Sequence, residues 1–126
     1  MDKATAGAHK LLANLDTNIA SGPDGLSNTI MKTCAEELAP AITDIHKRRL
    51  DAGTIPSDWR NPNVSPISKK GNTHEAINYR PASFTSICGK LLEHIICRHI
   101  LKHIENNTML THLQHGFRIG HSCESH

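Results

Sequence analysis

The sequence of 126 residues has few aromatic side chains: one Trp, one Tyr and two Phe, or 3% of the chain. Large rings bury the most area per residue, so a core here must be built from Leu, Ile, Ala and Val. The sequence therefore predicts a thin core and a marginally stable fold, as expected of a part of a larger domain. We expect Trp59, the only Trp, to pack the helical part of the chain against the segment that follows it.

Paired cysteines and long apolar runs are also missing. The four cysteines, Cys34, Cys88, Cys97 and Cys123, are irregularly spaced and form no CxxC pair. No stretch approaches about 18 consecutive apolar residues, and the polar start of the chain is unlike a secretory signal. We therefore expect reduced thiols, no membrane segment and an intracellular location, in the cytoplasm or the nucleus.

The net charge of +2 is small, but it is unevenly distributed. Residues 1–63 carry seven basic and eight acidic side chains, a net charge of −1, whereas residues 64–126 carry seven basic and four acidic ones, a net charge of +3. Eight of the ten histidines also lie in the second half. A basic half suits a polyanion such as nucleic acid, although a charge difference of this size is common.

Helical periodicity dominates the first half of the chain. Apolar residues recur at steps of three and four within residues 4–16 and again from Ser27 onward. Pro40 either ends the second helix or lies in the first turn of a third. That third helix is expected to stop at Gly53.

The second half predicts a hairpin followed by a long helix. Residues 63–69 alternate apolar and polar side chains and read as a strand, residues 69–72 form its tip, and residues 78–83 are extended. A long helix is expected from about residue 86 to residue 106, followed by a glycine-punctuated loop or strand at 114–121. The fold class predicted is α+β, mostly helical, with Pro66 indicating an edge or a bulge.

Three cations lie near the predicted hairpin tip: Lys69, Lys70 and Arg80. Two antiparallel strands would bring them to one side, where they could neutralise the phosphates of a nucleoside triphosphate. The alternative is a solvated Lys-Lys turn and an arginine paired with a carboxylate. Spacing alone favours that alternative.

Five segments resemble, in order and spacing, the amino-terminal half of a reverse transcriptase domain: ASGPDGL, LAPAITDI, GTIPSDWRNPNVSPISKKG, NYRPASFTSICGKLLEHII and LTHLQHGFRIGHSC. The resemblance is to non-LTR retrotransposons of the jockey-like or chicken-repeat type, and it runs from about Leu11 to Glu124. It implies the fingers of a right-hand polymerase. Residues 1–60 would form an amino-terminal helical extension, 61–84 the finger strands, 85–107 the long helix and 108–126 the start of the segment leading to the palm.

The resemblance also implies roles for individual residues. In such enzymes a finger-strand lysine and the arginine of the Arg-Pro motif contact the phosphates of the incoming deoxynucleoside triphosphate, and these positions match Lys69 (or Lys70) and Arg80. Asn78 and Tyr79 would set the turn before Arg80. The segment that lies beside the RNA template and DNA primer supplies the candidate nucleic-acid contacts Gln114, Gly116, Phe117 and Arg118.

The chain departs from the family pattern in two places: Ser68 stands where a bulky residue or Pro is more usual, and Ala82–Phe84 stands where Ile-Ser-Leu is usual. Both positions bear on the fine geometry of the fingers. The segment Gly22–Gly25 would be structural, packing the amino-terminal extension against the fingers.

The catalytic carboxylates of the family are missing from these 126 residues. Two-metal nucleotidyl transfer needs carboxylates that hold both ions, which the family supplies from a Phe-rich strand ending in Asp and from a Tyr-Ala-Asp-Asp hairpin. Glu36 and Glu37 do not replace them, since adjacent side chains point about 100° apart on a helix. We therefore assign no catalytic or metal-binding residue and expect no synthesis by the chain alone. Magnesium and the palm are implied only for the complete enzyme, and Ile87, Leu91 or Ile95 would be left exposed on the face meant for the palm.

Two alternative functions are a small RNA- or DNA-binding module and a zinc-stabilised helical protein. For the second, His99 and His103 are four residues apart on one helix and can share a face, with Cys88 and His112 joining from elsewhere. Structural zinc sites usually show two tight ligand pairs joined by a turn, so a helix that supplies most ligands would be unusual.

Overall fold

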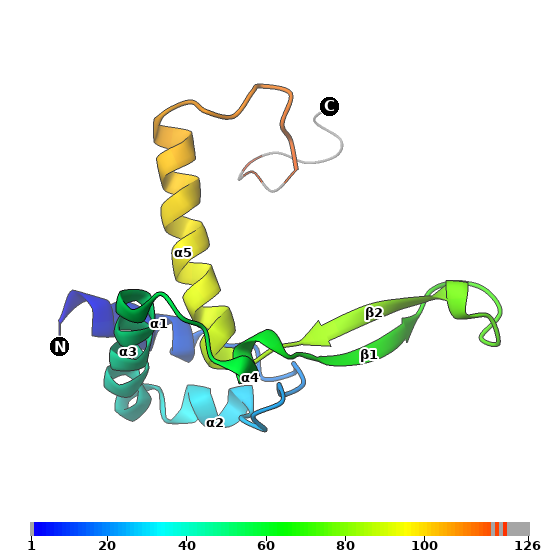
Figure 1. The fold of residues 1–126 in the computed structure, drawn as a ribbon, viewed down its shortest axis with the longest axis horizontal. Coiled ribbons are helices and arrows are strands. Elements are labelled where there is room, and N and C mark those ends of the chain that lie inside the picture. The colour runs from blue at the N-terminus through cyan, green and yellow to red at the C-terminus, as the bar shows by residue number, and fades with distance from the viewer. Residues whose placement is uncertain (1, 117, 119, 121–126) are drawn as a thin grey trace. The chain divides into compact units, whose positions relative to one another are not determined.

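The computed structural model describes residues 2–116, 118 and 120. The helices are α1 (Lys3–Ala13), α2 (Asn28–Thr33), α3 (Ala35–Ala52), α4 (Ser57–Arg60) and α5 (Ile87–Asn106). The strands are β1 (Asn63–Ser68) and β2 (Tyr79–Phe84), with a short 3-10 turn, η1 (Ala76–Asn78), before β2. About half of the chain is helical, and the α+β class predicted from the sequence is confirmed (Figure 1).

The chain divides into two compact units, residues 1–92 and residues 93–126. The first unit contains α1 to α4, the β1–β2 hairpin and the first turns of α5. The second contains the rest of α5 and the segment after it. None of the described helices is long and apolar enough to cross a membrane.

Local signals in the sequence set the ends of the first three helices. The Asp2 carboxylate accepts a hydrogen bond from the Thr5 amide at 2.7 Å and caps α1, and the Ser27 hydroxyl accepts one from the Ile30 amide at 3.2 Å and caps α2. Helix α3 ends at Gly53, which adopts φ +61°. The predicted stop at Gly53 is thus confirmed.

The predicted position of Pro40 is wrong. Helix α2 ends at Thr33, α3 begins at Ala35, and Pro40 lies inside α3, beyond its first turn. A proline that lacks an N–H cannot bond the carbonyl four residues back, here that of Glu36. Glu36 lies in the first turn of α3, so the missing bond falls near the start of the helix.

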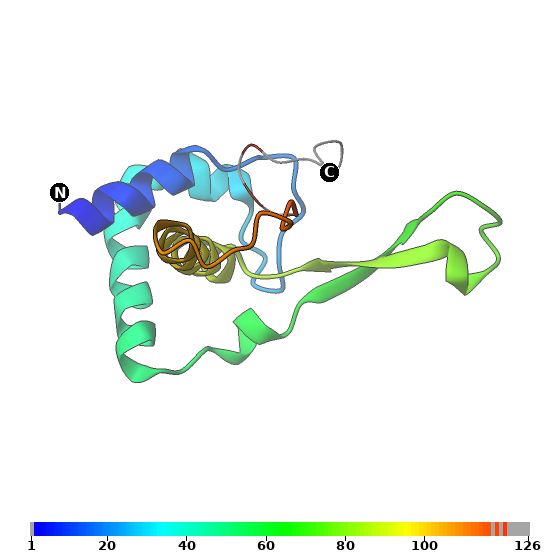
Figure 2. The same ribbon diagram turned by 90° about the horizontal axis from the view of Figure 1, so that it is seen from above.

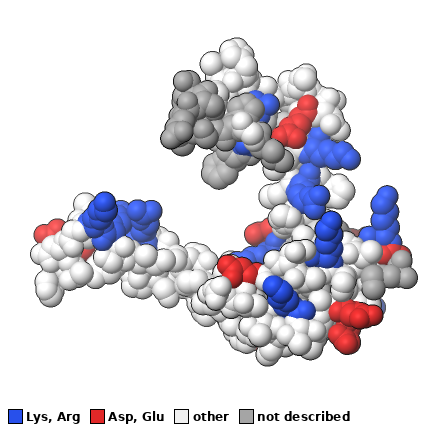
Figure 3. Space-filling view, turned by 180° about the vertical axis from the view of Figure 1, so that it is seen from behind, with Lys and Arg blue, Asp and Glu red and all other residues white. Residues whose placement is uncertain are grey.

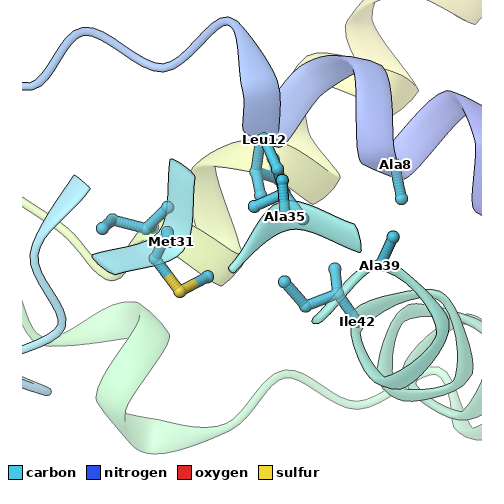
Figure 4. Close-up of a cluster of buried hydrophobic side chains, with 8 residues drawn as sticks. Ala8, Leu12, Met31, Ala35, Ala39 and Ile42 are labelled. Atoms are coloured by element: carbon cyan, nitrogen blue, oxygen red, sulfur yellow. The ribbon is translucent and has the colours of Figure 1, made fainter. Parts of the chain in front are cut away.

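A small core joins α1, α2, α3 and the first turns of α5. Its buried members are Ala8, Leu12, Met31, Ala35, Ala39, Ile42, Ile87 and Leu91. Figure 4 shows how the side chains of α1 and α3 meet, with Ala8 facing Ala39 and Leu12 beside Ala35. Alanines at these positions allow two helices to approach closely, so packing is achieved without large rings, as the composition requires.

The face of α5 predicted to be left exposed is instead buried in its first part. Ile87 and Leu91 belong to the core, and Ile95 is half-buried. The physical reason is that the first turns of α5 complete the core of α1 to α3, which has too few large side chains of its own. The exposed apolar side chains of α5 are Ile96, Ile100 and Leu101.

Strands β1 and β2 form a two-stranded antiparallel hairpin that projects from the helices of the first unit (Figures 1 and 2). The register pairs Asn63 with Phe84 and Ser68 with Tyr79. All six residues of β1 are exposed, because the helices cover neither face of that strand. Each strand has one unpaired edge, which agrees with the edge position predicted for Pro66.

Candidate nucleotide and nucleic-acid interface

The hairpin brings Lys69 and Arg80 to one face. The Lys69 amide donates to the Asn78 carbonyl at 2.6 Å, one position beyond the last ladder pair, Ser68 and Tyr79, and Asn78 is the last residue of the 3-10 turn η1. Residues directly opposite each other share a face, and side chains two positions apart on one strand also share it. Arg80 pairs with Ile67, and Lys69 follows Ile67 by two positions, so Lys69 and Arg80 are diagonal neighbours at the end of the ladder, where the typical spacing in a regular sheet is about 7–8 Å or slightly less.

Lys70 lies outside this ladder, in the bend that follows it. All three cations are exposed. Among the described residues none of them forms an ion pair; the Lys69 ammonium donates to the Ile77 carbonyl at 3.5 Å. Glu75 is the only acidic residue between positions 61 and 84. Figure 3 shows the basic side chains gathered along one side of the hairpin, with acidic atoms near its tip.

The loop that carries these cations is braced by side chains. The Asn78 amide donates to the Asn72 carbonyl at 2.7 Å, and the Tyr79 hydroxyl donates to the Thr73 carbonyl at 2.8 Å. Gly71 adopts φ +127°, a conformation that side-chain-bearing residues rarely take. Asn78 and Tyr79 thus hold the connection between the strands that precedes Arg80, a role that the resemblance implied.

The base of the hairpin is held by Trp59, for which the sequence predicted packing, and by His46, to which the sequence analysis gave no role. Trp59 of α4 precedes β1, Gly89 of α5 follows β2, and a Cβ atom added at Gly89 would lie 3.4 Å from the Trp59 side chain. The His46 ring of α3 packs edge-on against Trp59, with centroids 6.0 Å apart and planes at 85°. His46 Nε2 donates to the Cys88 carbonyl at 2.9 Å. Trp59 therefore joins helices α3 and α5 at the point where the hairpin leaves them, as expected for the only Trp.

Burial changes the acid–base properties of this cluster. Desolvation lowers the pKa of His46, and the hydrogen bond to the Cys88 carbonyl only partly opposes this effect. The pKa of the Cys88 thiol is raised, first by burial and then by the negative charge of Asp24. A sequence signal for His46 was present: it continues the buried stripe of Ala39 and Ile42 at steps of three and four.

The Gly22–Gly25 segment contacts the junction between β2 and α5. A Cβ atom at Gly22 would lie 2.5 Å from the Thr85 carbonyl oxygen and 2.8 Å from the Ser86 nitrogen, so only glycine fits. The Asp24 carboxylate accepts from the Leu26 amide at 3.2 Å, which closes the turn. The segment is structural, in agreement with the reading of the sequence.

The second set of candidate contacts lies in the unit 93–126. The Gln114 side chain donates to the Gly116 carbonyl at 3.1 Å. Arg118 is half-buried, and its Nη1 donates to the carbonyls of Thr111 at 3.3 Å and Gln114 at 3.4 Å. These hydrogen bonds lie within the loop itself, and the Arg118 guanidinium donates to two of its backbone carbonyls. Phe117 lies outside the described residues.

Metal ligands do not converge in the described part of the chain: no group of three or more His, Cys, Asp or Glu side chains is placed to hold an ion there. His99 and His103 share the exposed surface of α5, with a hydrogen-bond contact of 3.3 Å between Asn107 Nδ2 and His103 Nδ1. Glu36 and Glu37 lie exposed in the first turn of α3. There they favour the helix through its dipole.

No protein-family model and no curated protein matches this chain. The likeness to reverse transcriptases therefore rests on the motifs quoted from the sequence. The family and its activity are stated below as a proposal.

Proposed function

We propose that the chain is the fingers portion of an RNA-directed DNA polymerase of the non-LTR retrotransposon type. The observation that carries the proposal is the diagonal placement of Lys69 and Arg80 on one face of the hairpin. These are the two positions that the sequence motifs match to phosphate-contacting residues; Lys69 directly follows β1 and Arg80 lies on β2. An ammonium and a guanidinium at that separation suit adjacent phosphates of a deoxynucleoside triphosphate.

In the complete enzyme this chain would contribute binding and orientation. Lys69 and Arg80 would neutralise phosphate charge, with Lys70 reaching in from the bend. Gln114, Gly116, Phe117 and Arg118 would lie along the RNA template and DNA primer, and the palm of the same polyprotein would supply the metal-binding aspartates. Magnesium belongs to that complete site, and an intracellular location follows from the same reading.

The primary test is binding of a deoxynucleoside triphosphate to the purified chain by titration calorimetry. Lys69→Ala and Arg80→Ala should each weaken binding about tenfold or more, as expected for a lost charge-assisted hydrogen bond. Lys47→Ala, an exposed cation on α3, is the matched control and should leave affinity unchanged. Equal affinity for all variants would remove the nucleotide-binding role.

A primer-extension assay with magnesium addresses the enzymatic half of the proposal. The chain alone should yield no product, because the 126 residues contain neither the Asp-terminated strand nor the Tyr-Ala-Asp-Asp hairpin. Extension by the purified chain would overturn this assignment. The zinc-stabilised alternative predicts a loss of helicity on adding a chelator, whereas the fingers assignment predicts no change.

A further inference from the structure

Strand β1 carries a serine that is followed directly by a proline, Ser65 and Pro66. Of the six prolines in the chain, Pro66 is the only one that follows a Ser or a Thr. Ser65 is exposed, and its backbone is extended because it lies within the strand. Within the described part of the chain, no hydrogen bond uses the Ser65 hydroxyl. The hydroxyl therefore lies uncovered on a projecting hairpin (Figures 1 and 2).

The register of the hairpin places Ser65 on the same face as Arg80. Ser65 pairs with Ala82, and Arg80, two positions before Ala82, pairs with Ile67. Ser65 and Arg80 are thus diagonal neighbours, with a typical spacing of about 7–8 Å or slightly less in a regular sheet. Arg80 has Ser65 on one diagonal and Lys69 on the other. Ser65 and Lys69 are four residues apart, about 13 Å along an extended chain, so a group on Ser65 meets Arg80 first.

We propose that Ser65 is phosphorylated by a proline-directed serine/threonine protein kinase and that the phosphate then pairs with the Arg80 guanidinium. A kinase of this class selects proline after the acceptor, since proline brings no N–H that an apolar pocket would leave unpaired. All six residues of β1 are exposed. An isolated two-stranded hairpin is also marginally stable, so it can open locally to enter the cleft of a kinase.

The phosphoryl group comes from ATP bound to the kinase. The Ser65 Oγ attacks the γ-phosphorus, an O–P bond forms, and the bond between that phosphorus and ADP breaks. The hydroxyl proton passes to the catalytic aspartate of the kinase. The product carries a charge of about −1.5 to −2 at pH 7, and a phosphate and a guanidinium form two parallel, charge-assisted hydrogen bonds.

The phosphate also cancels the positive charge of the hairpin. Residues 61–84 carry three basic side chains and one acidic side chain, a net charge of +2 with a neutral histidine. A phosphate on Ser65 brings this charge to about zero and engages the guanidinium of Arg80. Phosphorylation therefore prevents nucleotide binding at Lys69 and Arg80. This consequence rests on the proposed function, whereas the modification and its pairing with Arg80 do not.

The modification is tested by incubating the full chain with ATP, magnesium and a purified cyclin-dependent protein kinase, and mass spectrometry maps the phosphorylated residue. One phosphate is expected at Ser65, and it should be lost in Ser65→Ala and in Pro66→Ala. Ser83→Ala is the matched control and should still be phosphorylated, because Ser83 is an exposed strand residue that precedes Phe84. No transfer to the chain, or transfer that persists in Ser65→Ala, would overturn the proposal.

Phosphorus NMR of the phosphorylated chain tests the pairing without any nucleotide. The second pKa of a phosphoserine is ordinarily about 6, and a guanidinium beside the phosphate should lower that pKa. In phosphorylated Arg80→Gln the pKa should return to the ordinary value. Lys47→Gln removes an exposed cation of α3 and should leave the pKa lowered. The same pKa in the parent and in Arg80→Gln would exclude the pairing.

The effect on the nucleotide site is measured as affinity for a deoxynucleoside triphosphate by titration calorimetry. Ser65→Glu, which places a carboxylate beside Arg80, should weaken binding about tenfold or more. Ser83→Glu adds the same charge on the opposite face, because Ser83 pairs with Val64, and should weaken binding less. Equal losses would overturn the face-specific effect. No binding by the parent chain would remove the nucleotide role and its regulation together, and the mass mapping and the phosphorus titration would still decide the modification and its pairing.

Discussion

Pro66 lies directly opposite Pro81 in the β1–β2 ladder. Neither proline has an N–H to donate to the facing carbonyl, so Pro66–Pro81 occupies a non-hydrogen-bonded position of the ladder. At such a pair the backbone N–H positions face away from the partner strand. Each proline therefore removes an N–H donor that would point away from the partner strand, at the middle of the open edge of its own strand. The hairpin loses no internal hydrogen bond by this. An exposed hairpin is otherwise a template for strand addition.

Restoring those donors should make the hairpin self-associate. In Pro66→Thr/Pro81→Thr each edge regains one N–H, and a net backbone hydrogen bond is worth about 1 kcal/mol, or roughly fivefold in association per bond. Light scattering across a concentration series should show a larger dimer or oligomer fraction. Ser68→Thr/Ser83→Thr, which adds β-branched side chains and no donor, is the control. Similar masses for both double variants would show that the prolines do not protect the edges.

The close approach of Gly22 to Thr85 predicts a large effect of one methyl group. Gly22→Ala places a Cβ against backbone atoms, which cannot move aside as a flexible side chain can, and should lower the free energy of unfolding by about 1–3 kcal/mol. Gly7→Ala on α1, where a Cβ meets nothing within 4 Å, should raise it by up to about 1 kcal/mol. Urea denaturation measures both. Equal effects of the same sign would contradict the packing described for Gly22.

The sequence predicted local structure better than it predicted contacts. Cap residues such as Ser27 and Gly53 act within a few positions of the chain, and so do the alternation in β1 and the long periodic stretch of α5. The limits of α2 and α3 were predicted wrongly, because the break falls at Cys34 and Pro40 is accommodated inside α3. The burial of Ile87 and Leu91 could not be predicted, because it depends on tertiary packing of α5 against α1, α2 and α3.

The candidate site shows the same division. The face shared by Lys69 and Arg80 follows from strand register, which the hairpin pattern contained. The engagement of the Arg118 guanidinium by the carbonyls of Thr111 and Gln114 could not be predicted, since a loop with several glycines has no periodicity that fixes its hydrogen bonds. His46 was given no role from the sequence, although it continues the buried stripe of Ala39 and Ile42 on α3.

The depressed pKa of His46 predicts acid sensitivity of the fold. The unfolded chain binds a proton near the ordinary value of 6.5, whereas the folded chain resists protonation to lower pH. The contribution of His46 to the free energy of unfolding is therefore fully present above about pH 6.5. It declines as the pH falls below that value and is lost once the pH passes the lowered pKa of the folded state. Unfolding free energies measured by urea at several pH values between 7.5 and 5 should show this decline.

His46→Gln should flatten that part of the stability profile while keeping an N–H donor for the Cys88 carbonyl. His74→Gln, on the exposed hairpin loop, should preserve the profile of the parent. A decline that persists unchanged in His46→Gln would assign the acid sensitivity to other groups. At pH 7.5 His46→Ala should cost about 1 kcal/mol from the lost hydrogen bond, in addition to the lost packing on Trp59.

Lys69 and Arg80 should be energetically coupled toward a triphosphate, and Lys70 should be coupled to Arg80 less. Two cations that share one face approach the same phosphates. The loss of binding free energy in the double variant should therefore differ from the sum of the two single losses by about 0.5–3 kcal/mol. Lys70 lies in the bend beyond the ladder, and no hydrogen bond between described residues joins it to Arg80. A double-mutant cycle for each pair, measured as affinity for a deoxynucleoside triphosphate, compares the two directly. Additive losses for Lys69 and Arg80 would mean that the two side chains do not bind the same triphosphate, although they lie on one face of the hairpin.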